Sequence, residues 1–467
     1  METLQRTANR GSISTGFDIN NSVKLEDDNT EYLQRPASGS DGSRRTMTIS
    51  MWLKRTEIDD DQIFISQGSN IRFRFKPNYF HIRLTDGSST YEIEDQNRLF
   101  RDSNAWYHLV VAIDTTQSTA SDRVKIYWNG VQHTSFTTAN YPGQNDDLTL
   151  GNFSSTTMQL GWFTEGGYGF NGYFAEVHYV DGTQVAQTEF GEFDEDSGIW
   201  KPKQYTGGHG SEGFHLKFED SSNLGLDSSG NSNNFNLNNI AAADQATDSP
   251  TNNFCTFNIL VQTDNKPTIN EGAMHVAGGG GNWNNAYGSL GVQNGKWYYE
   301  YKVTSTEFGF FGASTFPDTS DDATNAQFLY DQTFVIGYAA AHYYQRINGS
   351  QISNESTGWG TTSVNDIYGL FLNVDDQEFT VARNGSVLSG TLSQPVSFNS
   401  AFSGHFVFPC NAQYEDDGGE FNFGGYTLIS NTKSYNDANG YGNFVYSPVL
   451  SGVNYYSICT KNIAEFG

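Results

Sequence analysis

The chain has 467 residues, of which 36% are hydrophobic and 17% are charged, with 53 Asp and Glu against 26 Lys and Arg. The resulting net charge of −27 disfavours nucleic acid and anionic membranes as partners, and the low charged fraction disfavours disorder. Cys255, Cys410 and Cys459 show no metal-site or disulfide spacing, so we expect free thiols. The N-terminal stretch shows no apolar signal region, and no apolar run is long enough to insert into a membrane.

Alternation of apolar and polar residues dominates the chain, as in residues 46–54, 123–128 and 377–383. Asn-Gly pairs at 129–130 and 384–385 connect such stretches, and both residues tolerate the positive φ of a tight hairpin turn. Helical periodicity is nearly absent. These patterns predict an all-β fold with very little helix, formed by two antiparallel β-sandwich (jelly-roll) domains in series.

Composition along the chain predicts five segments. They are a polar lead that by its position is the expected attachment segment, a first strand-rich domain, a connector with small residues, a second strand-rich domain and a closing segment: residues 1–16, 17–240, 241–257, 258–445 and 446–467. The sequence FCTFNI at 254–259 is echoed by ICTKNI at 458–463. The echo indicates either chance or a strand of the same type that docks equivalently after each large domain.

Several strand-like stretches of the first domain occur in an order typical of a known family. They are SVKLEDDNTEYLQRP, TMTISMWLKR, AWYHLVVAID, VKIYWNGVQ and GYFAEVHYVDG. Together they make residues 22–200 resemble the LamG (concanavalin A-like) jelly-roll family. Residues 213–235 resemble the strand and turn that usually open such a domain, although here they come last. The first domain is therefore expected to be circularly permuted, or to be followed by an incomplete second copy.

The second domain carries GKWYYEYKV at 295–303, NDIYGLFLNVDDQEFTVARNG at 365–385 and FVFPCNAQYEDDGGEFNFG at 406–424. Through these motifs, residues 290–425 resemble an SPRY domain. Asn365 and Asn373 depart from the Gly and Asp of the family pattern. The resemblance implies a second β-sandwich that binds partners through loops at one end.

The stretches EFGEFDEDSGIWKPKQYTG and DSPTNNFCTFNIL, combined with the first domain, resemble phage tail-fibre-type proteins. The resemblance implies a virion structural protein that is assembled in the host cytoplasm and exposed on the particle exterior. Its expected partners are other virion proteins and a host-surface glycan or polysaccharide, contacted by a homo-oligomer, with a trimer favoured. A decoration protein of capsid or tail that binds only neighbouring virion proteins is the alternative. A glycan-degrading tailspike enzyme is the third interpretation.

The sequence predicts no catalysis. The carboxylate pairs Glu192/Asp194 and Glu92/Glu94 lack the third carboxylate of the glycosidase pattern E-x-D-x-x-E. No G-x-S-x-G elbow occurs, and the glycines at 278–281 lack the Lys-Ser/Thr of a phosphate loop. His209, in the glycine-rich GGHGSEG stretch, is expected to be a surface histidine, whereas His108 is expected to be a structural one within a strand.

Aromatic residues among Gly, Asn, Ser and Thr are candidate sugar-stacking groups, because pyranose rings present apolar faces to them. The candidates are Trp162, Tyr168, Trp283, Tyr343, Tyr344 and Trp359, each of which could instead pack against its own loop. No cofactor is required. Calcium is the metal that the oxygen-rich turns suggest, with Asp220, Asp227 and Asn231 as candidate ligands and Asx-turn stabilisation as the alternative.

Overall fold

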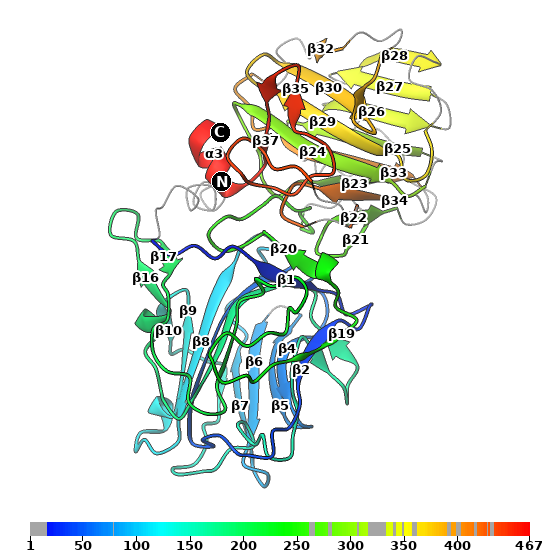
Figure 1. The fold of residues 1–467 in the computed structure, drawn as a ribbon. Helices are drawn as coiled ribbons and strands as arrows, with labels where there is room; N and C mark the ends of the chain where they lie inside the picture. The colour runs from blue at the N-terminus through cyan, green and yellow to red at the C-terminus, as the bar shows by residue number, and fades with distance from the viewer. Residues whose placement is uncertain are drawn as a thin grey trace. The chain divides into compact units, whose positions relative to one another are not determined.

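The computed structural model describes residues 16–77, 79–260, 267–278, 283–305, 308–315, 333–339, 342–347, 350–356, 362–389, 394–397, 403–414, 418–426, 428–429 and 434–467 (Figure 1). The described residues form two compact units, 16–251 and 252–467, here called the first and the second unit. The division falls inside the expected connector.

The first unit contains two sheets of eight described strands each. One, sheet A, has the order β10-β9-β8-β3-β15-β1-β20, with β18 also paired to β15. Its strands are β1 (Ser22–Leu25), β3 (Thr46–Arg55), β8 (Tyr107–Asp114), β9 (Val124–Trp128), β10 (Val131–His133), β15 (Gly172–Asp181), β18 (Phe214–Leu216) and β20 (Gln245–Ala246). The pairs along this path are antiparallel, as the alternating pattern predicts.

The second sheet of this unit, sheet B, has the order β11-β7-β6-β5-β4-β12-β2-β19. Its strands are β2 (Tyr32–Arg35), β4 (Gln62–Gln67), β5 (Ile71–Lys76), β6 (Tyr79–Thr85), β7 (Thr90–Asp95), β11 (Thr138–Ala139), β12 (Met158–Leu160) and β19 (Asn236–Asn238). Met51 and Leu53 of sheet A share one buried cluster with Phe73 and Phe75 of sheet B. The core therefore lies between the two sheets, and rings supply much of its buried area.

Smaller elements decorate the first sandwich. They are the hairpin of β13 (Trp162–Phe163) with β14 (Tyr168–Gly169), the hairpin of β16 (Gly191–Phe193) with β17 (Trp200–Pro202), and the 3₁₀ turns η2 (Ala120–Asp122), η3 (Gln187–Glu189) and η4 (Ala242–Asp244). Val185 and Phe190 pack on Val110 and Val180 of sheet A in a cluster separate from the main core. The segment after β15 thus covers part of the outer face of sheet A.

Strand β15 is irregular near its middle. Its register with β3 shifts between Ala175 and His178, and Glu176 has a φ of 46°. Such bulges redirect side chains and are costly for a residue other than glycine. Just beyond the bulge, β18 pairs with β15 and places His215 directly opposite His178. Residues 214–216 therefore belong to the first sandwich, while the circular permutation stays a prediction.

Residues 241–251 do not form an exposed linker. Strand β20 pairs with β1, and Asp248 is buried in the first unit. The Oγ of Ser22 donates a hydrogen bond to the backbone carbonyl of Asp248 at 2.7 Å. The small and polar residues of this stretch suggested a connector. Composition could not show that a short strand within it, β20, completes the edge of sheet A.

The second unit also has two large sheets among its described residues, besides the two-stranded pair of β35 (Val449–Leu450) and β36 (Val453–Asn454). The first has the order β21-β22-β34-β24-β29-β30-β31, with β32 beside β30 and β37 beside β24. Its strands are β21 (Thr268–Asn270), β22 (His275–Ala277), β24 (Lys296–Val303), β29 (Ile367–Asn373), β30 (Glu378–Arg383), β31 (Ser386–Val387), β32 (Val396–Ser397), β34 (Gly418–Asn422) and β37 (Tyr456–Ser457).

The other sheet has the order β23-β33-β25-β26-β27-β28. Its strands are β23 (Trp283–Tyr287), β25 (Phe308–Ser314), β26 (Thr333–Ala339), β27 (His342–Ile347), β28 (Ser350–Ser356) and β33 (Phe408–Tyr414). The rings of Tyr301 and Phe311 lie 4.8 Å apart between the two sheets, and the hydroxyl of Tyr299 donates to the carbonyl of Gly312 at 2.6 Å. The two sheets therefore face each other as a second β-sandwich.

The closing segment contains β35 (Val449–Leu450), β36 (Val453–Asn454), β37 and the short helix α3 (Thr460–Phe466). The two echoed sequences pair with each other in the second unit: Cys255 N–H donates to Ile458 at 2.9 Å, and Thr460 N–H to Asn253 at 2.9 Å. The two echoes therefore lie side by side in the second unit, and their equivalent docking stays a prediction. All three cysteines are buried thiols outside any disulfide, as expected.

The described residues thus confirm an all-β fold of antiparallel sandwiches with very little helix. Within the same residues, no helix has the length and apolar character needed to cross a bilayer.

Candidate functional site

One end of the first sandwich brings aromatic and acidic side chains together. The hairpin β13–β14 places Trp162 opposite Gly169, and the ring of Trp162 stacks on that of Tyr32 with centroids 5.9 Å apart. Tyr168 on the same hairpin is 41% exposed, whereas Trp162 is half-buried. Trp162 therefore packs against Tyr32 of β2 and beside Gly169 of its own hairpin, and Tyr168 offers the more accessible ring.

The polar part of this end is built around Asn171, which precedes β15. Its Nδ2 donates to Asp27 Oδ1 at 2.8 Å and also to Glu57, while its Oδ1 accepts the backbone N–H of Asp27 at 2.7 Å. Burial raises the pKa of Asp27 and of Glu57 above the usual values, and the neighbouring carboxylates add to the rise. We call Asp27, Tyr32, Trp162, Tyr168 and Asn171 the rim site.

Close approach of two chain segments holds the rim site together. A side-chain carbon at Gly169 would lie 2.2 Å from the Cβ of Asp27 and 3.0 Å from the ring of Trp162. Only glycine fits between these groups, because a larger residue would push the acidic turn away from the hairpin. Glycine at 169 therefore sets the spacing between the acidic and the aromatic parts of the rim site.

Next to the rim site, Glu26, Asp27 and Asp28 each bring one carboxylate oxygen within 4.8 Å of the others. Such oxygens are ligands that suit a hard cation such as Ca²⁺. The calcium candidates named from the sequence lie elsewhere. Asp220 and Asp227 accept backbone N–H groups within their own turns, from Ser222 and Ser229 respectively.

Asn231, the third calcium candidate, donates from Nδ2 to the carbonyls of Gly210 and Gly213 at 2.6 and 3.0 Å. The bonds of Asp220 and Asp227 are those of turn stabilisation, the alternative stated for these residues, whereas those of Asn231 link its turn to the segment before β18. Calcium binding at these residues stays a prediction.

The other aromatic candidates belong to the second unit. Trp283 is the first residue of β23 and pairs with Tyr414, and Tyr343 and Tyr344 lie within β27. The expectation that these three residues lie in loops is therefore wrong, because each belongs to a paired strand. Trp359 lies outside the described residues.

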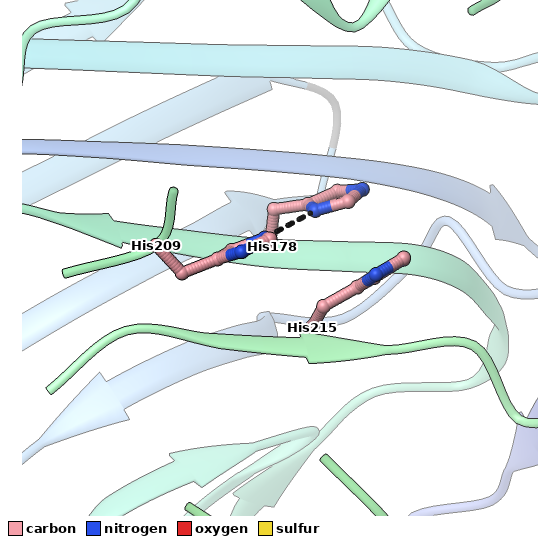
Figure 2. Close-up of side chains that lie close together, drawn as sticks. All are labelled: His178, His209 and His215. Atoms are coloured by element: carbon pink, nitrogen blue, oxygen red, sulfur yellow. Dashed lines mark hydrogen bonds between the residues drawn. The ribbon is translucent and has the colours of Figure 1, made fainter. Parts of the chain in front are cut away.

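A second polar cluster lies on the outer face of sheet A and consists of His178, His209 and His215 (Figure 2). His178 comes from β15, His215 from β18 and His209 from the glycine-rich loop before β18. The three rings lie nearly parallel, with centroids 3.9 Å apart for His178 and His215 and 5.4 Å apart for His178 and His209. Nδ1 of His178 and Nε2 of His209 are 3.1 Å apart.

Glu176 closes one side of this histidine cluster. Its Oε2 lies 2.6 Å from Nε2 of His215 and 3.3 Å from Nε2 of His178. Burial opposes its charge, yet the hydrogen bonds to the two histidines lower the pKa of Glu176 to about 2. Burial, reinforced by the neighbouring His215, lowers the pKa of His178 to about 3 and that of His209 to about 4. At neutral pH both imidazoles are therefore uncharged.

The expectation that His209 is an ordinary surface histidine is wrong, because its ring stacks beside two others. His178 and His215 were not singled out, since only the pairing of β15 with β18 makes them neighbours. The structural role expected of His108 is confirmed: Nε2 bonds to Ser50 Oγ, and Nδ1 accepts the indole N–H of Trp200, both at 2.9 Å.

The carboxylate pairs considered for glycosidase chemistry contact lysines. Lys201 Nζ lies 3.4 Å from both Glu192 and Asp194, and Lys76 Nζ lies 3.0 Å from Glu94. Contacts with a lysine favour the ionised form of a carboxylate, which is unsuitable for a general acid.

Comparison with known proteins gives one family match. Residues 27–188 match the family described as the concanavalin A-like lectin/glucanases superfamily, and no curated protein matches the chain. Among solved structures, the SPRY domain of human HERC1 is 16% identical, covers 35% of this chain and 96% of its own, and gives a TM-score of 0.27. The TRIM65 PSpry domain is 11% identical. Its match covers 36% of this chain and 88% of the TRIM65 chain, with a TM-score of 0.29. Residues 27–188 are therefore similar to a concanavalin A-like domain.

Proposed function

We propose that this chain is a non-enzymatic carbohydrate-binding protein whose rim site contacts sugar. The observation that carries the proposal is the meeting of the Trp162 ring, Asp27 and Asn171 beside Gly169, with the exposed Tyr168 next to Gly169 on the same hairpin. An aromatic ring stacks on the apolar face of a pyranose, while a carboxylate and an amide orient its hydroxyls. The family match supports this class of ligand because its description names lectins.

The same description names glucanases, so catalysis is the competing function. The lysine contacts of Glu94, Glu192 and Asp194 support binding without hydrolysis.

At a finer level, we propose a phage virion protein of the tail-fibre type, exposed on the particle and assembled as a homotrimer. The sequence resemblance of the first domain and connector supports this role. Repeated copies of a weak sugar site would then gain affinity through avidity. A decoration protein that binds only neighbouring virion proteins remains the second candidate. A reconstruction of the intact particle distinguishes the two, because a fibre would carry its rim site outward.

The binding proposal is tested with the full chain on an array of bacterial surface polysaccharides. We expect Tyr168→Ala to weaken binding about fivefold, since one ring stack contributes ~1 kcal/mol. Asp27→Asn should weaken it comparably by removing a charged acceptor. Tyr435→Ala is the matched control, because Tyr435 is 45% exposed in the second unit. Binding that survives both rim changes, or release of reducing sugar from the array polysaccharides, contradicts the proposal.

A further inference from the structure

We propose that His178, His209 and His215 form a binding site for a divalent transition metal ion of the zinc class. This site is separate from the rim site and does not depend on sugar binding. One ligand nitrogen from each of the three imidazoles lies within 4.8 Å of the other two. Three imidazoles at this spacing are a ligand set that zinc, cobalt and nickel ions prefer over the oxygen-seeking calcium and magnesium.

Glu176 determines which nitrogens remain for the ion. Because its carboxylate contacts Nε2 of both His178 and His215, each of these rings keeps Nδ1 for the metal. Nδ1 of His178 already faces Nε2 of His209 at 3.1 Å. A carboxylate that hydrogen-bonds the far nitrogen of a ligating histidine fixes its tautomer and orientation, as in carboxylate–histidine–zinc arrangements. Glu176 is therefore a positioning residue.

The backbone around the cluster holds the proposed ligands in fixed positions. The bulge in β15 places Glu176 at a φ of 46°, a conformation that costs free energy for this residue type. The same strand aligns His178 opposite His215, so two ligands come from paired positions of one sheet. The side chains of His178 and His215 are 5% and 11% exposed, which limits competition from water.

The third ligand, His209, determines how an ion reaches the histidine cluster and what its binding would change. His209 is half-buried in a loop that carries glycines at 207, 208 and 210, so an ion can approach from its side. A bound ion would fasten this loop to sheet A by replacing one hydrogen bond between His178 and His209 with coordination by three rings. Because protein nitrogens supply three ligands, a water molecule would complete a tetrahedral shell.

The test adds Zn²⁺ and Co²⁺ to the metal-stripped full chain. We expect one ion per chain by calorimetry, visible absorption bands of tetrahedral Co²⁺, and a melting temperature raised by about 5 °C at a hundredfold excess of Zn²⁺ over its Kd. His209→Ala should weaken the affinity at least tenfold without unfolding the chain, because His209 lies in a loop. Glu176→Gln should weaken it less and shift the Co²⁺ bands.

His405→Gln is the control, since His405 is exposed in the second unit and should leave binding unchanged. Sugar binding by the His209→Ala chain separates this inference from the proposed function, because the rim site is intact in it. The inference is overturned if Co²⁺ shows only octahedral bands, or if His209→Ala binds the ion as tightly as the unmodified chain.

Discussion

Replacing Asp248 by alanine is expected to lower the free energy of unfolding of the first unit by about 3–5 kcal/mol. Asp248 Oδ2 lies 2.7 Å from Nζ of Lys54, and Oδ1 accepts the indole N–H of Trp106 at 3.0 Å. The side chains of Lys54 and Asp248 are 0% and 1% exposed. Their mutual attraction offsets the cost of burying both, so the alanine variant leaves a buried ammonium without this carboxylate. Urea unfolding followed by tryptophan fluorescence measures the change.

Two control variants test whether the loss of stability comes from the buried ion pair. The surface pair Arg45–Asp147 has similar geometry, with a 2.7 Å contact, but its side chains are 44% and 54% exposed. Asp147→Ala should therefore change the unfolding free energy by less than ~1 kcal/mol. The double variant Lys54→Met with Asp248→Leu should recover most of the loss, because it removes both charges. A loss below ~1 kcal/mol for Asp248→Ala alone would show that the buried pair is not important for stability.

Acid is expected to destabilise the first unit, starting near pH 6.5. Burial, reinforced by the neighbouring His178, lowers the pKa of His108 to about 3. Burial, followed by the Arg74 guanidinium, lowers the pKa of His81 to about 3. Between pH 6.5 and 3 the unfolded chain binds more protons at these residues than the folded chain, so stability falls as the pH falls. Each histidine should remove ~2 kcal/mol by pH 5.

A substitution of His108 measures how much this residue contributes to the loss of stability at low pH. Nδ1 of His108 accepts the indole N–H of Trp200. Protonation of Nδ1 would therefore place two N–H donors against each other. His108→Gln lacks the titrating group, and its unfolding free energy should depend on pH more weakly, by about 1.4 kcal/mol per pH unit between pH 6 and 4. Equal slopes for His108→Gln and the unmodified chain would contradict the prediction.

The strands were the most predictable part of this structure. Residues 46–54 alternate so clearly that β3 could be expected, and Val124 and Ile126 of β9 point into the core as that pattern requires. Segments without a period of two were harder to interpret. Strand β20 has two residues, which is too short for any periodicity, so the expected connector was assigned from composition alone.

The candidate sites were predictable only in part, because both depend on contacts distant in sequence. Trp162 and Tyr168 were recognisable as aromatic residues in a glycine-rich stretch. Asp27 was not recognisable as their neighbour, because its proximity depends on the space that Gly169 leaves. The histidine cluster depends on the register of β18 against β15, which brings His215 to His178 across 37 positions of sequence. No local pattern encodes that register.

The pairing of the echoed sequences has a practical consequence for engineering. Asn253 N–H donates to Thr460 Oγ1 at 3.0 Å, and Lys461 N–H donates to Asn252 Oδ1 at 3.3 Å. The stretch that enters the second unit is thus tied to one close to its last residue. A module whose ends meet can be grafted into a surface turn of another scaffold through two short tethers, without cutting any sheet.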